Sequence, residues 1–230
     1  MNTDAAELER HARALLRPEV YDYYAGGSGR EATLRGNEEA WRHIRLWPRI
    51  FRDVSAVDTG VDLTDGVGRE CRRLRTPMAV APMAFHGFAH PDGELATAAG
   101  AARAGALYVL STRSSRRIED VAAVLASTEG APGAGGTWWF QVYLMRDREL
   151  TAGLVSRAAA AGAQALVLTA DTPVVGRKGR SKGRSQGDDM VTEADFLVNL
   201  GPLADLSSAE QASDVTFADI GWLTDVSGGL

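Results

Sequence analysis

The sequence lacks the features that would place it in an oxidising compartment or a membrane. Its 230 residues contain one cysteine, Cys71, so no disulfide can form within them, which favours a reducing environment. The first residues, MNTDAAELERHARALL, are charged throughout and have no apolar signal core. No apolar run approaches the ~20 residues that a membrane-spanning helix needs. These absences predict a cytoplasmic protein with no membrane span.

Basic residues are also too few for a general nucleic-acid binder. Lys and Arg total 25 against 30 Asp and Glu, giving a net charge of −5, whereas such binders are normally basic. A basic run over residues 177–184 is most simply a solvated loop, and its glycines lack the order of a P-loop. The composition, 45% hydrophobic and 24% charged, is typical of a globular protein with one large domain or two small ones.

Residues 1–75 are predicted to form a helical segment followed by a hairpin. Asp4 has the spacing of an N-cap for the first helix, and Pro18 suits the first turn of the second. A third helix is expected over residues 31–43, with one apolar face buried: Leu34, Trp41 and Ile44. Residues 61–74, with an Asp-Gly turn at their centre, favour a β-hairpin.

Residues 76–230 alternate apolar strands with helical stretches. Four strands are predicted, at residues 78–81, 107–110, 138–143 and 165–169. Such alternation predicts right-handed βαβ units about a parallel sheet, and its period suits a (β/α)8 barrel, which needs about 250 residues. The expected fold class is therefore α/β, a TIM (β/α)8-type barrel, with only about the first four β/α units present after the N-terminal helical segment and hairpin.

Two loops of this region carry further predictions. Ser114 or Ser115 is expected to open the helix that follows the second strand. Residues 174–215 are long, polar and Gly-rich, which predicts a functional lid or an insertion, because structureless loops of that length are uncommon. Thr216 is expected to open a last short helix.

Polar residues follow the predicted strands, and a parallel barrel gathers such strand ends at one mouth. The ends read Ala81–Ala84, Ser111-Thr112, Gln141–Tyr143 and Thr169–Pro173. Their backbone amides, hydroxyls, amide and phenol could bind the polar edge of a heteroaromatic cofactor, while Asp171 orients a base. Plainer interpretations stay open: Asp171 could cap a turn, and Ser111 could satisfy backbone groups, whereas a half-buried Gln141 favours a ligand.

Tyrosines and histidines elsewhere have structural interpretations. Tyr21, Tyr23 and Tyr24 are typical of helix packing. His86 and His90 are four residues apart, but a glycine and a proline break any helix there and no third ligand is evident. No metal site is predicted.

Several motifs run in order from about residue 15 to residue 177. They are residues 20–24 (VYDYY), 45–49 (RLWPR), 81–84 (APMA), 89–94 (AHPDGE), 140–143 (FQVY) and 168–173 (LTADTP). Together they resemble the FMN-dependent 2-hydroxy-acid oxidase/dehydrogenase family, which includes glycolate oxidase, lactate oxidase and mandelate dehydrogenase. The overall likeness is to its mandelate and hydroxymandelate oxidase branch.

The resemblance implies FMN as cofactor and the oxidation of a small (S)-2-hydroxy acid, such as lactate, glycolate or a mandelate-like acid, to the 2-oxo acid. It implies that Tyr23, Tyr143 and Lys178 bind the substrate. Lys178 stands where the family usually has an arginine, so a bidentate contact to the carboxylate is not expected. Tyr143 and Asp171 are the implied catalytic residues, with Asp171 pairing with the catalytic histidine. The flavin ring would be held by Pro82, Met83, Ala84, Ser111, Gln141 and Thr169.

The chain also departs from that family. The histidine, lysine and arginine expected on later strands, and the phosphate site, would lie beyond Leu230. We therefore expect a homo-oligomer or a complementing C-terminal half as partner, beside the small substrate. The alternative is a catalytically inactive truncated half barrel that acts as a binding or interaction protein. A different barrel enzyme would need a lysine or paired carboxylates at the strand ends, which offer only Asp171.

Overall fold

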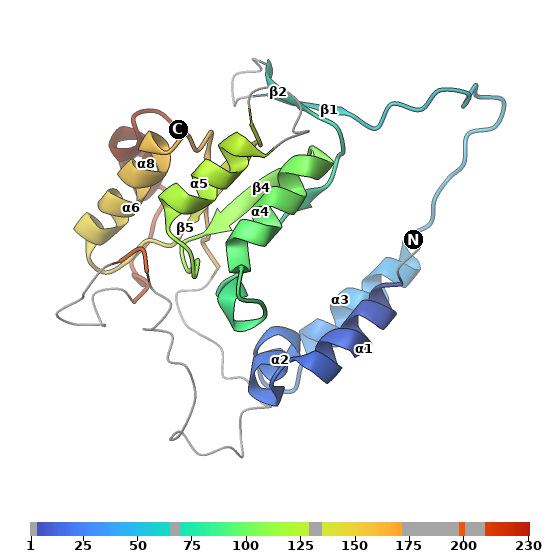
Figure 1. The fold of residues 1–230 in the computed structure, drawn as a ribbon, viewed down its shortest axis with the longest axis horizontal. Helices are drawn as coiled ribbons and strands as arrows, with labels where there is room; N and C mark the ends of the chain where they lie inside the picture. Colours follow the sequence, from blue (N-terminus) through green and yellow to red (C-terminus); the bar gives the residue numbers. More distant parts are fainter. Residues whose placement is uncertain (1–3, 65–69, 129–134, 172–197, 201–209) are drawn as a thin grey trace. The chain divides into compact units, whose positions relative to one another are not determined.

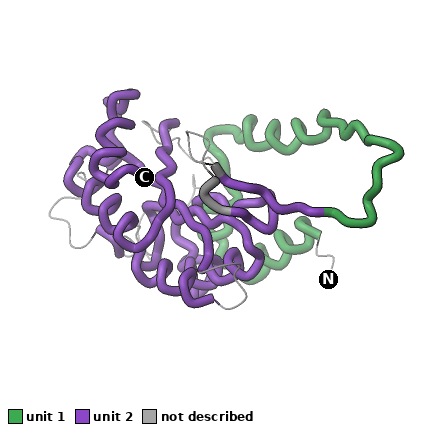
Figure 2. Tube along the Cα trace, turned by 90° about the horizontal axis from the view of Figure 1, so that it is seen from above, with its two compact units in different colours: residues 1–57, 175–191 green, residues 58–174, 192–230 purple. Residues whose placement is uncertain are grey.

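The computed structural model describes residues 4–64, 70–128, 135–171, 198–200 and 210–230. These residues fall into two compact units, which divide between Val57 and Asp58 (Figure 2). The predicted hairpin therefore belongs to the second unit. No helix in the described part of the chain is both long and apolar enough to cross a bilayer.

The first unit contains the three predicted helices. They are α1 (Ala5–Leu15), α2 (Pro18–Ala25) and α3 (Ala32–His43) (Figure 1). The side chain of Asp4 accepts a hydrogen bond from the Ala6 N–H (3.2 Å) at the start of α1, and Pro18 occupies the first turn of α2, as the sequence predicts.

The predicted apolar face of α3 is not buried, so that expectation is wrong. Leu34, Trp41 and Ile44 are 37%, 74% and 59% exposed, although Leu34 lines a hollow together with residues of α1 and α2. The exposed apolar character continues beyond the helix. We call residues 44–57 the apolar segment; its large exposed side chains are Ile44, Leu46, Trp47, Ile50, Phe51, Val54 and Val57.

The second unit combines an antiparallel hairpin with a four-stranded parallel sheet. The hairpin pairs β1 (Val61–Thr64) with β2 (Glu70–Leu74). The sheet has the order β3-β4-β5-β6, with bounds Ala79–Val80, Leu107–Ser111, Trp138–Val142 and Leu166–Leu168. The four predicted strands and their parallel pairing are thus confirmed, with bounds that differ by at most one residue at each end.

Each pair of neighbouring strands is joined through a helix, as in a βαβ unit. These helices are α4 (Gly93–Ala104), α5 (Ile118–Ser127) and α6 (Arg148–Ala160), and the last helix, α8 (Ala218–Ser227), packs against α6. Figure 1 shows α4 and α5 side by side over one face of the sheet. A short 3-10 helix, η1 (His86–Phe88), precedes α4.

The two faces of the sheet belong to different apolar clusters. On β4, Tyr108 and Leu110 join the main core with residues of α4, α5 and α6. The alternate residues Leu107 and Val109 instead pack with Leu74 of the hairpin, in a smaller cluster. Because successive strand residues point to opposite faces, the sheet has one face covered by helices and a second face. The hairpin covers the second face at Leu107 and Val109.

The start of α5 differs from the prediction. Arg117, not Ser114 or Ser115, is its N-cap, and the Ile118 N–H donates to Oδ1 of Asn199 (2.9 Å). Asn199 is buried, so this part of the expected 174–215 loop is packed against the unit. Most of that loop lies outside the described residues.

Candidate functional site

Three polar residues meet at the C-terminal ends of β4, β5 and β6. Gln141 is 1% exposed, and its Oε1 accepts from the Ser111 hydroxyl (3.3 Å) and the Thr112 N–H (3.1 Å). Its Nε2 donates to the Thr169 hydroxyl (2.8 Å). By strand alternation, Ser111 and Gln141 share the face of Val109, opposite the helices. The predicted cofactor-binding residues of three separate strands are therefore joined by hydrogen bonds.

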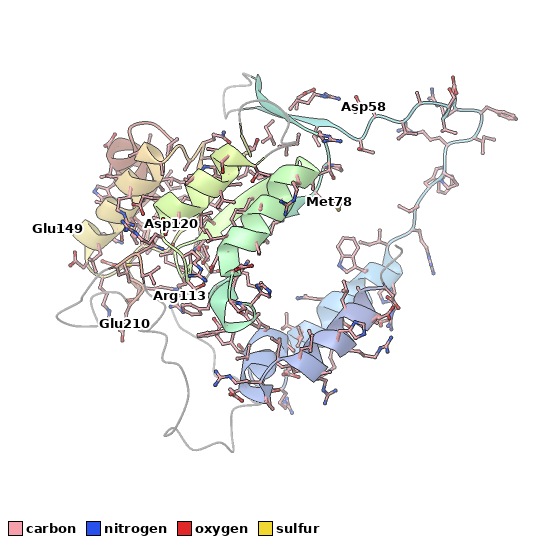
Figure 3. All side chains as sticks on the ribbon, in the orientation of Figure 1. Asp58, Met78, Arg113, Asp120, Glu149 and Glu210 are labelled. Carbon is pink, nitrogen blue, oxygen red and sulfur yellow. The ribbon has the colours of Figure 1, made fainter. Side chains whose placement is uncertain are left out.

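A second contact fixes the ends of β4 and β5 against each other. The hydroxyl of Thr112 donates to the Gln141 carbonyl oxygen (2.5 Å) and accepts from the Tyr143 N–H (3.3 Å). The guanidinium of Arg113 lies 5.5 Å from the centre of the Tyr143 ring, and Figure 3 labels Arg113 beyond the strand ends. Tyr143 is half-buried, so its ring borders the same edge of the sheet.

The end of β3 presents exposed apolar residues rather than polar side chains. Pro82 and Met83 are exposed and Ala84 is half-buried. Phe85 follows in the left-handed region (φ 59°), and its N–H donates to the carbonyl oxygen of Arg113 (3.0 Å). This hydrogen bond joins the segment after β3 to the segment after β4.

The remaining predicted site residues are not brought into this network by the described structure. Asp171 is exposed and is the last residue of the described range 135–171. Tyr23 lies on α2 in the first unit, where its ring makes an edge-to-face contact with Tyr24 (centroids 5.1 Å apart). Lys178 lies outside the described residues.

A cluster that the sequence reasoning missed lies beside the β3 end. Glu94, in the first turn of α4, is 0% exposed. Its Oε1 accepts from the N–H groups of His86 (3.1 Å) and Ser115 (2.8 Å), and its Oε2 accepts from the Ser115 hydroxyl (2.5 Å). In the sequence, Glu94 is indistinguishable from an ordinary first-turn acid, and only its place in the AHPDGE motif could have drawn attention to it.

His86 itself is buried rather than poised as a metal ligand. Its Nδ1 lies 2.9 Å from the Thr97 hydroxyl, while His90 is exposed. Burial lowers the pKa of His86 below its ordinary value, and the nearby Glu94 carboxylate opposes that shift. Among the described residues, no three His, Cys, Asp or Glu side chains gather as metal ligands.

The donors and acceptors at the strand ends fit a flat heteroaromatic ring. Oε1 of Gln141 already accepts two hydrogen bonds, but an amide nitrogen carries two hydrogens, and only one is used by Thr169. Hydroxyls of Ser111 and Thr169, the carbonyl of the exposed Pro82 and the N–H of the exposed Met83 add further donors and acceptors. The set can recognise ring nitrogens and carbonyl groups by hydrogen bonds. Because Ser111, Gln141 and Thr169 are uncharged, these side chains place no net charge beside the ring.

Comparison with known proteins gives consistent matches over most of the chain. A sequence model described as "FMN-dependent dehydrogenase" matches residues 12–227. The chain is 41% identical to 4-hydroxymandelate oxidase of Amycolatopsis orientalis over 83% of its length, and 43% identical to L-lactate oxidase of Nostoc sp. over 76%. These alignments span 49% and 45% of the relatives, so the chain spans about half the length of the curated relatives it matches.

Solved structures give the same result for the fold. A mandelate oxidase variant with (S)-mandelic acid superposes with a TM-score of 0.76 at 37% identity, over 96% of this chain and 58% of that one. The parallel sheet with its connecting helices is therefore similar to the corresponding part of that oxidase.

Proposed function

The chain belongs to the FMN-dependent dehydrogenase family, and we propose that it supplies one side of the active site of an FMN-dependent (S)-2-hydroxy-acid oxidase. The observation that carries this proposal is the buried network of Ser111, Gln141 and Thr169 at three adjacent strand ends. A buried amide with hydroxyl partners is costly to desolvate, and apolar residues in place of all three side chains together would serve a purely structural sheet end at least as well.

The cofactor contacts follow from that network. The backbone of Pro82–Ala84 would lie along the ring, and Ser111, Gln141 and Thr169 would hydrogen-bond its polar edge. When bound, FMN supplies the two-electron acceptor for the substrate's oxidation. The chain's own contribution is to orient the ring, because strand ends fixed by Thr112 and Gln141 cannot shift independently.

The substrate and acid–base roles rest on residues outside the hydrogen-bonded network. Tyr143 would donate to a substrate oxygen near the reacting carbon, and Tyr23 and Lys178 would bind the substrate carboxylate. Asp171 is exposed, so its carboxylate is accessible to a histidine that takes up the substrate's proton. That pairing would fix the histidine's tautomer and stabilise its charged form. We propose that a complementing part of the barrel contributes the histidine.

The apolar segment supports the need for a complementing part. Trp47 and Phe51 are 94% and 100% exposed, and contiguous exposed apolar surface of this kind marks an interaction site. Within the described residues, β3 and β6 each pair with one strand only, and such edges invite a further strand. We propose that the strand–helix repeats of the second unit form part of a TIM barrel, completed by a C-terminal half or by a second copy.

Absorbance spectroscopy tests the proposal. FMN is added to the purified chain, unbound flavin is removed, and (S)-mandelate, (S)-lactate or glycolate is then added without oxygen. A retained oxidised-flavin spectrum supports the cofactor site, and bleaching by one of the acids supports the oxidase chemistry. The proposal would be refuted if the chain stayed colourless after the addition of FMN, with wild type and Gln141→Leu retaining equally little flavin. That result would favour a non-catalytic half barrel that binds partners.

A further inference from the structure

The turn after β3 has a backbone conformation that its own sequence does not favour. Phe85 is buried and has φ 59° and ψ 46°, in the left-handed region that is costly for residues other than glycine. Such a conformation persists only where the surrounding structure holds it in place. The residues directly before it, Pro82–Ala84, form the proposed flavin-facing backbone.

Three successive N–H groups of this turn are bound from outside it. The Phe85 N–H donates to the carbonyl oxygen of Arg113 (3.0 Å). The His86 N–H donates to Oε1 of Glu94 (3.1 Å), and the Gly87 N–H donates to the hydroxyl oxygen of Ser115 (2.9 Å). The first turn of α4 and the segment between β4 and α5 therefore hold the turn together.

Glu94 joins these two elements. Its fully buried carboxylate also accepts the N–H and the hydroxyl of Ser115, so one side chain binds both segments at once. Hydrogen bonds to an ionised acceptor are stronger than neutral ones, and a buried carboxylate is costly to leave without them. Glu149 provides a contrast, because it occupies the equivalent second position of α6 (labelled in Figure 3) but is exposed.

We propose that Glu94, acting with Ser115, is a positioning residue for the flavin site. By holding His86 and Gly87, it fixes the left-handed turn at Phe85 and thereby the direction in which the backbone of residues 82–84 meets the ring. Glu94 contacts no ligand in this scheme and acts through the backbone. The link to FMN rests on the proposed function, whereas the hold on the turn does not.

The test compares Glu94→Ala, Glu94→Gln, Ser115→Ala and the matched control Glu149→Ala in the 230-residue chain. Hydrogen exchange of the amides of residues 85–87 is followed by mass spectrometry. FMN affinity is measured by quenching of flavin fluorescence, at a temperature below every variant's unfolding midpoint. Glu94→Ala and Ser115→Ala should exchange about tenfold faster at these amides and bind FMN about tenfold more weakly.

Glu94→Gln should restore most of both properties, since it keeps an oxygen that accepts the two N–H groups, and Glu149→Ala should match wild type. A merely structural role would lower the unfolding midpoint without changing FMN affinity below it. Wild-type exchange at residues 85–87 in Ser115→Ala, which removes only one oxygen atom, would overturn the proposed hold on the turn. Faster exchange with unchanged FMN affinity would overturn its link to the flavin. Failure of wild type to bind FMN would reject the proposed function and that link, while the exchange rates still decide whether Glu94 holds the turn.

Discussion

Replacing Gln141 by leucine should destabilise the second unit substantially, although the two side chains have similar size. Leucine would leave the buried Thr112 N–H without its acceptor, at a cost of about 1–3 kcal/mol, and Thr169 without its donor, at about 1 kcal/mol. Removing a buried amide returns about 1 kcal/mol or more. We therefore expect a net loss of about 2 kcal/mol in the free energy of unfolding.

Urea denaturation followed by tryptophan fluorescence measures this loss. Trp138 lies on the same strand as Gln141 and is 3% exposed, so the short-wavelength emission, to which the exposed Trp41 and Trp47 contribute little, reports the second unit. Gln164→Leu is the matched control: Gln164 also accepts a backbone N–H, from Trp138 (3.3 Å), but is exposed. Water can replace that bond, so the control should change stability by less than about 0.5 kcal/mol.

The reasoning fails if Gln141→Leu stays within about 0.5 kcal/mol of wild type at an unchanged m-value. Such a result would mean that Thr112 and Thr169 find other partners easily, and that the three strand ends are not fixed by the amide. FMN affinity is a separate readout, because Gln141→Leu also removes the amide proposed to hydrogen-bond the ring and should weaken binding even if stability is unchanged.

Three further predictions concern local interactions. Asp147 accepts hydrogen bonds from two N–H groups at the start of α6, so Asp147→Ala should cost about 1 kcal/mol and lower the melting temperature in calorimetry, while Asp147→Asn retains most of it. The Arg157 guanidinium lowers the pKa of Glu119 to about 2, so its stabilisation is present above the ordinary value of 4.5 and lost as pH falls toward 2. Glu119→Gln should therefore differ from wild type in urea at pH 6 by less than about 1 kcal/mol, because both side chains are partly exposed, and the difference should shrink at pH 3. Burial lowers the pKa of His86 below its ordinary value of 6.5, so the imidazole is protonated in the unfolded chain at a higher pH than in the folded one. Stability therefore falls as the pH drops below about 6.5. His86→Gln should make the melting temperature depend less on pH between about pH 7.5 and 5.5.

The sequence was sufficient where structure depends on short patterns. Apolar runs such as 107–110, followed by Ser111, indicate both the strand and its polar end, and the structure confirms the strand. Gln141 could be singled out because an amide stands out in an otherwise apolar strand, and its part in binding a cofactor stays a prediction. Its partners could be anticipated only through the order of the parallel sheet, which places β4 and β6 on either side of β5.

Structure that depends on distant residues could not be predicted in this way. Ser115 is of a type that often caps helices, yet its hydroxyl donates to Glu94. Asn199, not a serine, accepts the N–H of Ile118 at the start of α5. The apolar face of α3 has the spacing of a buried helix, but spacing alone does not supply an element to cover it. For Ser115 and Ile118 the deciding partner lies 21 and 81 positions away along the chain.

The bond between Ile118 and Asn199 also has a consequence for the order of folding on the ribosome. These residues are 81 positions apart, and at about 5–20 residues per second that interval takes roughly 4–16 s to synthesise. During that time α5 must form without its acceptor at Ile118. The nascent unit would therefore form β3 to β5 and their helices early. The hydrogen bond at the start of α5 would form only after Asn199 has been synthesised.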